Sequence, residues 1–261
     1  MTAEPLYQLD TGRLLGALGL IAIALGLSSW QRLGLTWNLA LATGRTLLQL
    51  GAVGYVLAVV FDWGNPWITL AVLLLLLTMA AIVTRNRISQ KIPRLLPVVW
   101  GSLAVSLLLT LTYTIGVVIQ PEALFDPRYW IPLAGGVLGH AMGSAGIAGE
   151  QLVSTLNQHR LDIETHLSLG ATPQQAIAVY TRQAIRAAVL PTLNTMAIVG
   201  IVSLPGFLSG QLLGGVEPLN AAAYQTLLML MLAFSSLVAS LLVTAGIRQR
   251  CFNRAAQLIL P

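Results

Sequence analysis

The chain has 261 residues, of which 56% are hydrophobic and only 9% are charged, and its mean hydropathy is +0.78. A soluble domain carries roughly 25% charged residues, so these proportions exclude a cytosolic enzyme, a disordered chain and a nucleic-acid-binding protein, despite an isoelectric point near 9.9. The single cysteine, Cys251, excludes an internal disulfide framework and a cysteine-based metal cluster. The sequence therefore predicts an all-α integral membrane protein in contact with lipid.

Charge-free stretches divide the chain into predicted membrane spans. A helix needs about 20 mostly apolar residues to cross the hydrocarbon core. By this measure we predict about seven transmembrane helices in a single transmembrane domain, residues 1–261. The spans are expected at about 14–30, 45–61, 67–84, 96–119, 130–150, 186–204 and 221–246.

The stretch 33–44, between the first two spans, is too short to cross the membrane. Trp30 and Trp37 favour a position at the membrane interface. We therefore expect an interfacial elbow that leads into the second span. At the inner end of that span, Arg45 is expected to reach the headgroups, and Gln49, one turn deeper, either lines a pathway or bridges two helices.

Basic residues are distributed unevenly between the two sets of connecting segments. With the N-terminus outside, the inner segments hold 12 of the 14 Lys and Arg residues, and six of the nine acidic residues lie outside. Cytoplasmic loops carry the excess of basic residues, so the expected orientation is N-terminus out and C-terminus in. The inner segments in this arrangement are 31–45, 85–95, 150–186 and 247–261.

The fifth span has a glycine-rich face. At 100° per residue, this face carries Gly135, Gly139, Gly143 and Gly146, and Glu150 continues it. Small residues at this spacing let helix backbones approach closely. The face either packs against a neighbouring helix or a second copy of the chain, or lines a pathway that changes between transport states.

Polar side chains in the same span are candidates for a transport pathway. His140 lies mid-span, with Met142 nearby and Ser144 one turn further on. An ionisable residue at this depth is rare and usually faces the protein interior. His140 either hydrogen-bonds a neighbouring helix or contacts a metal ion in transit, together with Met142 and Glu150. An imidazole and a thioether do not complete a metal site, so the metal ligands stay open.

Residues 150–186 are far longer than a simple connector needs. A helical pattern ends at Gly170, the residue type favoured just past a helix end. Thr172 and Pro173 then restart a helix as N-cap and first helical residue, and the second helix is expected to run through Gln174–Leu190. The segment is predicted to be a cytosolic helix–glycine–helix hairpin that presents apolar residues near its bend, namely Leu167, Leu169, Ala171 and Ile177.

Two functions fit this hairpin. It can lie on the lipid headgroups as a surface element, or it can dock into a groove on a partner protein by a short helix with exposed apolar residues. In the second case, its connection to a membrane helix would transmit the partner's motion.

The sixth span is expected to end at the outer face, in the string Ser203-Leu-Pro-Gly206. Proline and glycine stop the helix there, and the charge-free stretch that follows is either a plain turn or a re-entrant loop that acts as a gate. Ser203 is therefore a further candidate pathway residue.

The hairpin resembles a known element. Glu164-Thr-His-x3-Gly170, followed by a helix that ends at Leu190-Pro191, is similar to the EAA loop of ABC-transporter permeases, the coupling helix that sits in a cleft of the ATPase subunit. Thr165 and His166 stand where that loop has alanines, and Leu-Pro falls later than in importers. These departures argue against a standard nutrient importer.

The whole chain resembles FetB-like ABC-transporter permeases, which are described as iron exporters and have plant relatives linked to aluminium tolerance. The matching strings lie between residues 44 and 225. They are Gly44-Arg45-x3-Gln49-Leu50-x2-Val53-Gly54-Tyr55-Val56-Leu57, Leu167-Ser-Leu-Gly-Ala-Thr-Pro173, Arg186-Ala-Ala-x-Leu-Pro191 and Val202-Ser-Leu-Pro-Gly206-x2-Ser209-Gly210.

The resemblance implies a homodimeric permease of the bacterial inner membrane that exports iron or another metal ion. A separate ATP-binding subunit would hydrolyse ATP, so no cofactor and no enzymatic activity are expected in this chain. ATP and Mg would bind the partner, because the chain has no GxxxxGK[ST] motif and its single lysine, Lys91, lies in no glycine-rich loop. The residues expected to couple to the ATPase are Glu164, Leu167, Leu169, Gly170, Ala171, Thr172 and Pro173.

Two other mechanisms compete with this one. An ion-coupled secondary transporter would work without an ATPase, but it usually needs carboxylates inside the membrane, and the charge-free runs contain none. An intramembrane enzyme needs a motif such as HExxH, whereas His140, His159 and His166 are scattered. The cargo and the direction of transport follow from the resemblance alone.

Overall fold

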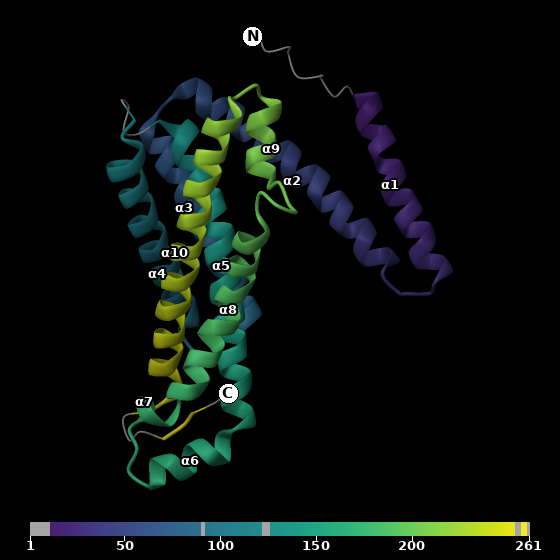
Figure 1. Cartoon of the computed structure of the whole chain (residues 1–261). Helices are drawn as coiled ribbons and strands as arrows, with labels where there is room; N and C mark the ends of the chain where they lie inside the picture. The colour runs from purple at the N-terminus through teal and green to yellow at the C-terminus, as the bar shows by residue number, and fades with distance from the viewer. Residues whose placement is uncertain (1–10, 90–91, 122–125, 254–256, 260–261) are drawn as a thin grey trace. The chain divides into compact units, whose positions relative to one another are not determined.

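The computed structural model describes residues 11–89, 92–121, 126–253 and 257–259, and every regular element in these ranges is a helix (Figure 1). The predicted all-α class is confirmed for this part of the chain. The chain divides into two compact units, residues 1–65 with 213–215 and residues 66–212 with 216–261. Each unit is described by itself.

The first unit contains α1 (Thr11–Trp30) and α2 (Thr36–Trp63), which contact each other. Gly34, with a φ of +69°, lies in the turn between them, and α2 then runs for 28 residues without interruption. The expected elbow over 33–44 is therefore wrong from residue 36 onward. Arg45 had divided the charge-free runs, but an arginine whose head reaches the interface does not interrupt a helix.

The second unit is a bundle of five long helices with short elements between them. The long helices are α3 (Pro66–Ile88), α4 (Leu95–Tyr113), α5 (Pro127–Gln158), α8 (Ala178–Ile198) and α10 (Pro218–Cys251). The short elements are η1 (Thr114–Ile119, a π-helix that continues α4), α6 (Arg160–Ser168), α7 (Pro173–Ala176) and α9 (Gly206–Leu213). The central pair is α5 and α10, because they pack along each other and both contact α4 and α8.

Small and hydroxyl-bearing residues let the central helices approach closely. A Cβ added to Gly149 of α5 would lie 2.5 Å from Cδ1 of Ile88, closer than real Cβ contacts. Between α4 and α10, the Ser106 hydroxyl donates to the Ser235 carbonyl oxygen at 2.9 Å. Such contacts are typical of helices packed in lipid, where burial of apolar surface no longer drives association.

Hydropathy and exposure identify the second unit and α2 as membrane-embedded. Among the described residues, five helical stretches are long and apolar enough to cross a membrane, namely α2, α3, α4 with η1, α5 and α10. Side chains that point out of the bundle are apolar as well, such as Leu75, Leu108 and Leu230, each more than half exposed. Apolar residues all round a helix indicate a lipid environment. The prediction of a membrane protein is confirmed. Six of the predicted spans lie within helices, whereas the predicted span 186–204 extends past the end of α8 at Ile198.

Helix α8 ends differently from the prediction. It passes through Pro191 and ends at Ile198, so neither Leu190-Pro191 nor the string that begins at Ser203 terminates it. Proline inside a membrane helix removes one backbone hydrogen bond, here the one to the carbonyl of Ala187, and membrane helices tolerate this loss. Gly200, with a φ of +80°, makes the turn that follows.

Candidate functional site: a capped hairpin at the basic end of the bundle

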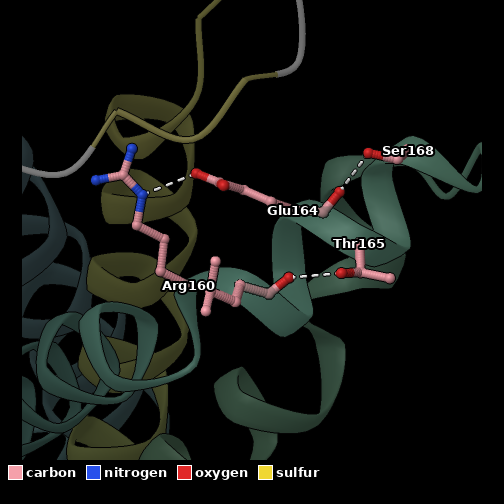
Figure 2. A network of polar contacts seen from close by, with 5 residues as sticks. Arg160, Glu164, Thr165 and Ser168 are labelled. Atoms are coloured by element: carbon pink, nitrogen blue, oxygen red, sulfur yellow. Dashed lines mark hydrogen bonds and ion pairs between the residues drawn. The ribbon is translucent and has the colours of Figure 1, made fainter.

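The first arm of the predicted hairpin is α6, which leaves α5 at His159. Figure 2 shows that its polar side chains bond within the helix: Arg160 Nε lies 2.8 Å from Glu164 Oε1, and the Ser168 hydroxyl donates to the Glu164 carbonyl oxygen at 2.8 Å. The Thr165 hydroxyl donates in the same way to the carbonyl one turn earlier. These contacts join residues one turn apart, so they stabilise α6 itself but do not attach it to the bundle.

The bend is capped on both sides. Gly170 has a φ of +90°, and its N–H and that of Ala171 donate to carbonyl oxygens of α6, both at 3.0 Å. This is the Schellman pattern of a helix C-terminus. On the other side, the Gln175 N–H donates to Thr172 Oγ1 at 3.3 Å and the Thr172 N–H donates to Gln175 Oε1 at 2.9 Å, which is a capping box. The predicted glycine end and the Thr172-Pro173 restart are confirmed.

Buried side chains attach both arms to the bundle. Ile163 of α6 and Ile177, which separates α7 from α8, are both 0% exposed and belong to the main hydrophobic core. Where the chain leaves α5, the His159 ring stacks on Tyr180 of α8, with ring centroids 5.0 Å apart. The hairpin is therefore fixed to the bundle at its base.

Two predictions for the second arm are wrong. Ile177 is buried rather than presented at the bend, and its backbone (φ −110°, ψ 6°) interrupts the helix expected over Gln174–Leu190. The physical reason is that the isoleucine reaches the core only if the chain turns between α7 and α8. A helical periodicity read along the sequence cannot reveal such a turn.

The hairpin still presents apolar surface outward. Leu169, at the bend, and Leu161, on α6, are each 79% exposed. Leu167 is partly buried and packs against the core, and Ala171 is partly exposed. Leu161 on α6 and Leu169 just beyond the end of this helix make an exposed apolar surface that fits an apolar groove.

Arginines gather at the end of the second unit that carries the hairpin. They lie at the ends of α3 and α10, before α4, on α6 and in the first half of α8, and are Arg85, Arg87, Arg94, Arg160, Arg182, Arg186, Arg248 and Arg250. At the opposite end, the described charged residues are Arg128, Asp126 and Glu217. Other residues that entered the charge count, Glu4, Asp10, Lys91, Glu122 and Arg254, lie outside the described residues.

The glycine face of α5 is open in its N-terminal half and packed in its C-terminal half. A Cβ added to Gly135, Gly139 or Gly143 would meet no atom within 4 Å. At Gly146, it would lie 3.0 Å from Cδ of Arg87. The C-terminal half of the predicted packing face thus contacts α3, whereas the three glycines of the N-terminal half have room for a Cβ.

The candidate pathway residues of α5 do not converge. His140 is exposed, Met142 is partly buried against the core, and Ser144 is buried. Glu150 pairs with Arg87 at 3.0 Å and lies ten residues from His140, about 15 Å along the helix. The described residues contain no group of three His, Cys, Asp or Glu side chains that could hold a metal ion. Because of their separation along α5, His140 and Glu150 of one chain do not share a site.

The two remaining pathway candidates lie elsewhere. Gln49 is an exposed residue of α2 in the first unit. Ser203 lies in the turn after α8, where its carbonyl oxygen accepts a hydrogen bond from the Gly200 N–H at 2.9 Å.

Sequence reasoning missed three polar features of the bundle. The Arg87–Glu150 ion pair joins α3 to α5 across 63 positions, and no local signal predicts it. Gln225 of α10 is 4% exposed, and neither polar atom of its side chain has a partner among the described residues. Buried hydroxyls follow α4 at four-residue spacing, a pattern visible in the sequence, at Ser102, Ser106, Thr110 and Thr114.

Comparison with known proteins identifies the family. The sequence matches the profile of the family described as "Uncharacterised protein family (UPF0014)" over residues 11–252. It is 48% identical to the "UPF0014 membrane protein slr1647" of Synechocystis over 98% of both chains, and 31% identical to the "Probable iron export permease protein FetB" of Escherichia coli over 94% of this chain and 93% of that protein. It is 32% identical to the "Protein ALUMINUM SENSITIVE 3" of Arabidopsis thaliana over 93% of this chain and 87% of that protein. No solved structure matches the chain. The resemblance to FetB-like permeases is thereby confirmed, and the chain belongs to the UPF0014 family of membrane proteins.

Proposed function

We propose that this chain is the membrane-spanning permease subunit of an ABC transporter that exports iron or another metal ion. The observation that carries the proposal is the hairpin: a short helix, capped on both sides of its bend, anchored by Ile163 and Ile177 and presenting Leu161 and Leu169 outward. The printed name of the E. coli relative, an iron export permease, supports the cargo and the direction. ATP hydrolysis takes place in a separate subunit that binds ATP and Mg.

The proposed membrane arrangement has seven spans, with the N-terminus outside and the C-terminus in the cytoplasm of a bacterium. It adds α1 and α8 to the five stretches that are long and apolar enough by themselves. The arginines at the hairpin end of the second unit support this orientation, because cytoplasmic loops carry the excess of basic residues. The hairpin then faces the cytosol, where an ATP-binding subunit can reach it.

The geometry indicates how the two subunits would be coupled. The partner's movement would displace α6 through the two exposed leucines. Because Ile163 and Ile177 lie in the bundle core, the displacement would pass to α5 and α8, the helices on either side of the hairpin. Changes of helix packing of this kind are a common form of conformational switching.

The proposed homodimer would use the open half of the α5 glycine face. Gly135, Gly139 and Gly143 leave room for the backbone of a second copy. The second copy would also shield the exposed His140, which lies in the middle of a membrane span and is unfavourable in contact with lipid.

The proposal is tested by reconstituting the permease with a stand-alone ATP-binding subunit encoded beside its gene and measuring Fe²⁺ transport into inside-out vesicles. Transport should require both subunits and ATP. Leu169→Asp should weaken binding of the ATP-binding subunit by at least about tenfold, since a buried leucine contributes about 1.5–3 kcal/mol. The matched control is Gln158→Asp, which adds the same charge at the end of α5 and should leave binding unchanged.

Two results would overturn the proposal. Replacement of residues 164–173 by a Gly/Ser linker with full retention of ATPase binding and transport would show that the hairpin does not couple the subunits. Transport driven by an ion gradient, with no ATP-binding subunit present, would instead identify a secondary transporter.

A further inference from the structure

The C-terminal end of the chain folds back on α10. The Ile259 N–H donates to the Cys251 carbonyl oxygen at 2.7 Å, and the Asn253 N–H donates to the Gln257 carbonyl oxygen at 3.1 Å. Side chains reinforce the reversal, because Asn253 Nδ2 donates to Gln257 Oε1 at 2.8 Å. We call residues 257–259 the C-terminal strap.

The strap faces the first arm of the hairpin across a cavity. Leu258 is 6% exposed and belongs to the same hydrophobic core as Ile163 and Ile177. Together with Gln257, it forms one wall of a cavity of about 500 Å³, whose other wall is the hairpin, from Arg160 and Glu164 of α6 to Ala171 beyond the bend. Figure 1 places the strap beside α6 and α7, and Figure 2 shows the C-terminal segment passing the Arg160–Glu164 pair.

The residues just before the strap flank the other side of the bend. Phe252 packs against the core and lines a second cavity, of about 320 Å³, together with Thr172, Pro173 and Gln174 at the start of the second arm. Phe252 and Leu258 are paired across the reversal by an antiparallel β-bridge. Leu258 therefore lines a cavity on one side of the Gly170 bend and Phe252 lines a cavity on the other side, and the β-bridge joins these two residues.

Little else fixes α6 from that side. Its own polar contacts are local, one helical turn apart, and of its nine residues only Ile163 is buried. Ile163 and the partly buried Leu167 anchor one face of α6. Leu258 belongs to the same core and lines the cavity beside α6. Without the strap, α6 could tilt about its base at His159 while each of its internal hydrogen bonds stayed intact.

We propose that the C-terminal strap positions the hairpin and that Leu258 is the positioning residue. The inference rests on the proposed function, since the position of the hairpin affects transport only if the hairpin transmits motion to the bundle. The strap holds α6 at a fixed angle, so that a movement of the ATP-binding subunit displaces α5 and α8 instead of tilting α6 alone. The match to the family profile covers residues 11–252, and the strap lies outside it.

The first measurement uses the permease alone, in detergent. Leu258→Ala should make the amides of residues 160–169 exchange with deuterium about tenfold faster, since loss of the buried leucine favours local opening. Leu258→Met, which keeps the apolar volume, should restore slow exchange. The matched control is Ile259→Ala, at an exposed neighbour whose backbone hydrogen bond is retained, and it should not change exchange of α6.

The second measurement is the number of ATP molecules hydrolysed per Fe²⁺ ion transported by the reconstituted complex. Leu258→Ala should raise this ratio several-fold, whereas a loss of folded permease would lower hydrolysis and transport together. Unchanged α6 exchange in Leu258→Ala, or an unchanged ratio, would overturn the inference. If the exchange results are as expected but the wild-type permease neither binds nor needs an ATP-binding subunit, the proposed function fails while the positioning of the hairpin by the strap stands.

Discussion

Gly170 allows a specific test of the hairpin structure, because this position needs a glycine only for its backbone conformation. Its φ of +90° lies in the region that side chains disfavour, and a Cβ added there would meet no atom within 4 Å. Gly170→Ala therefore introduces no clash, and its cost is that of a left-handed L-residue, about 1–2 kcal/mol. That cost corresponds to a roughly 5- to 30-fold shift toward an opened bend.

Hydrogen–deuterium exchange at residues 166–172 measures this opening directly. The amides of Gly170 and Ala171, which cap α6, should exchange roughly 5- to 30-fold faster in Gly170→Ala. Gly170→Asn should show a smaller change, because asparagine tolerates the left-handed region. Gly101→Ala, in α4 with no atom near its added Cβ, serves as the control. Wild-type protection of these amides in Gly170→Ala would refute the assignment of the cap.

Two further predictions concern the bundle core. Gln225→Leu removes a buried amide that has no hydrogen-bond partner among the described residues. This variant should be more stable than the wild type by about 1–3 kcal/mol in thermal unfolding. A lower melting temperature would show that the amide is paired. Gly149→Ala places a Cβ 2.5 Å from Cδ1 of Ile88 and should destabilise by about 1–3 kcal/mol, with partial recovery when Ile88→Val removes that atom. Gly139→Ala, where the Cβ would meet nothing, is its control, and equal melting temperatures of the two alanine variants would contradict the packing of α5 on α3.

The helix ends show where reasoning from the sequence was reliable. The bend at Gly170 and the restart at Thr172-Pro173 were predictable because capping depends on a few consecutive residues. Charged residues and prolines predicted helix ends less well. Arg45 did not interrupt α2, and Pro191 did not end α8, because a snorkelling side chain or one missing backbone hydrogen bond is tolerated in a membrane helix.

In the candidate site, too, local features were predictable from the sequence and long-range features were not. The hairpin and its exposed Leu169 were expected, whereas the burial of Ile177 and the cavity that Leu258 lines with the hairpin were not. His140, Met142 and Glu150 are close in sequence but point to different sides of α5 or lie turns apart. Proximity along a helix does not make side chains converge, since each residue rotates the direction by 100°.

The sequence by itself determined that this protein is helical, embedded in lipid and carries a capped hairpin, because hydropathy and capping are signals read over a few to about 20 neighbouring residues. Only the tertiary structure decided which face of α5 is packed, that Arg87 pairs with Glu150, and that the C-terminal strap lines a cavity beside α6. These are contacts between residues tens of positions apart. They depend on how the helices pack against one another, and no local sequence pattern specifies that packing.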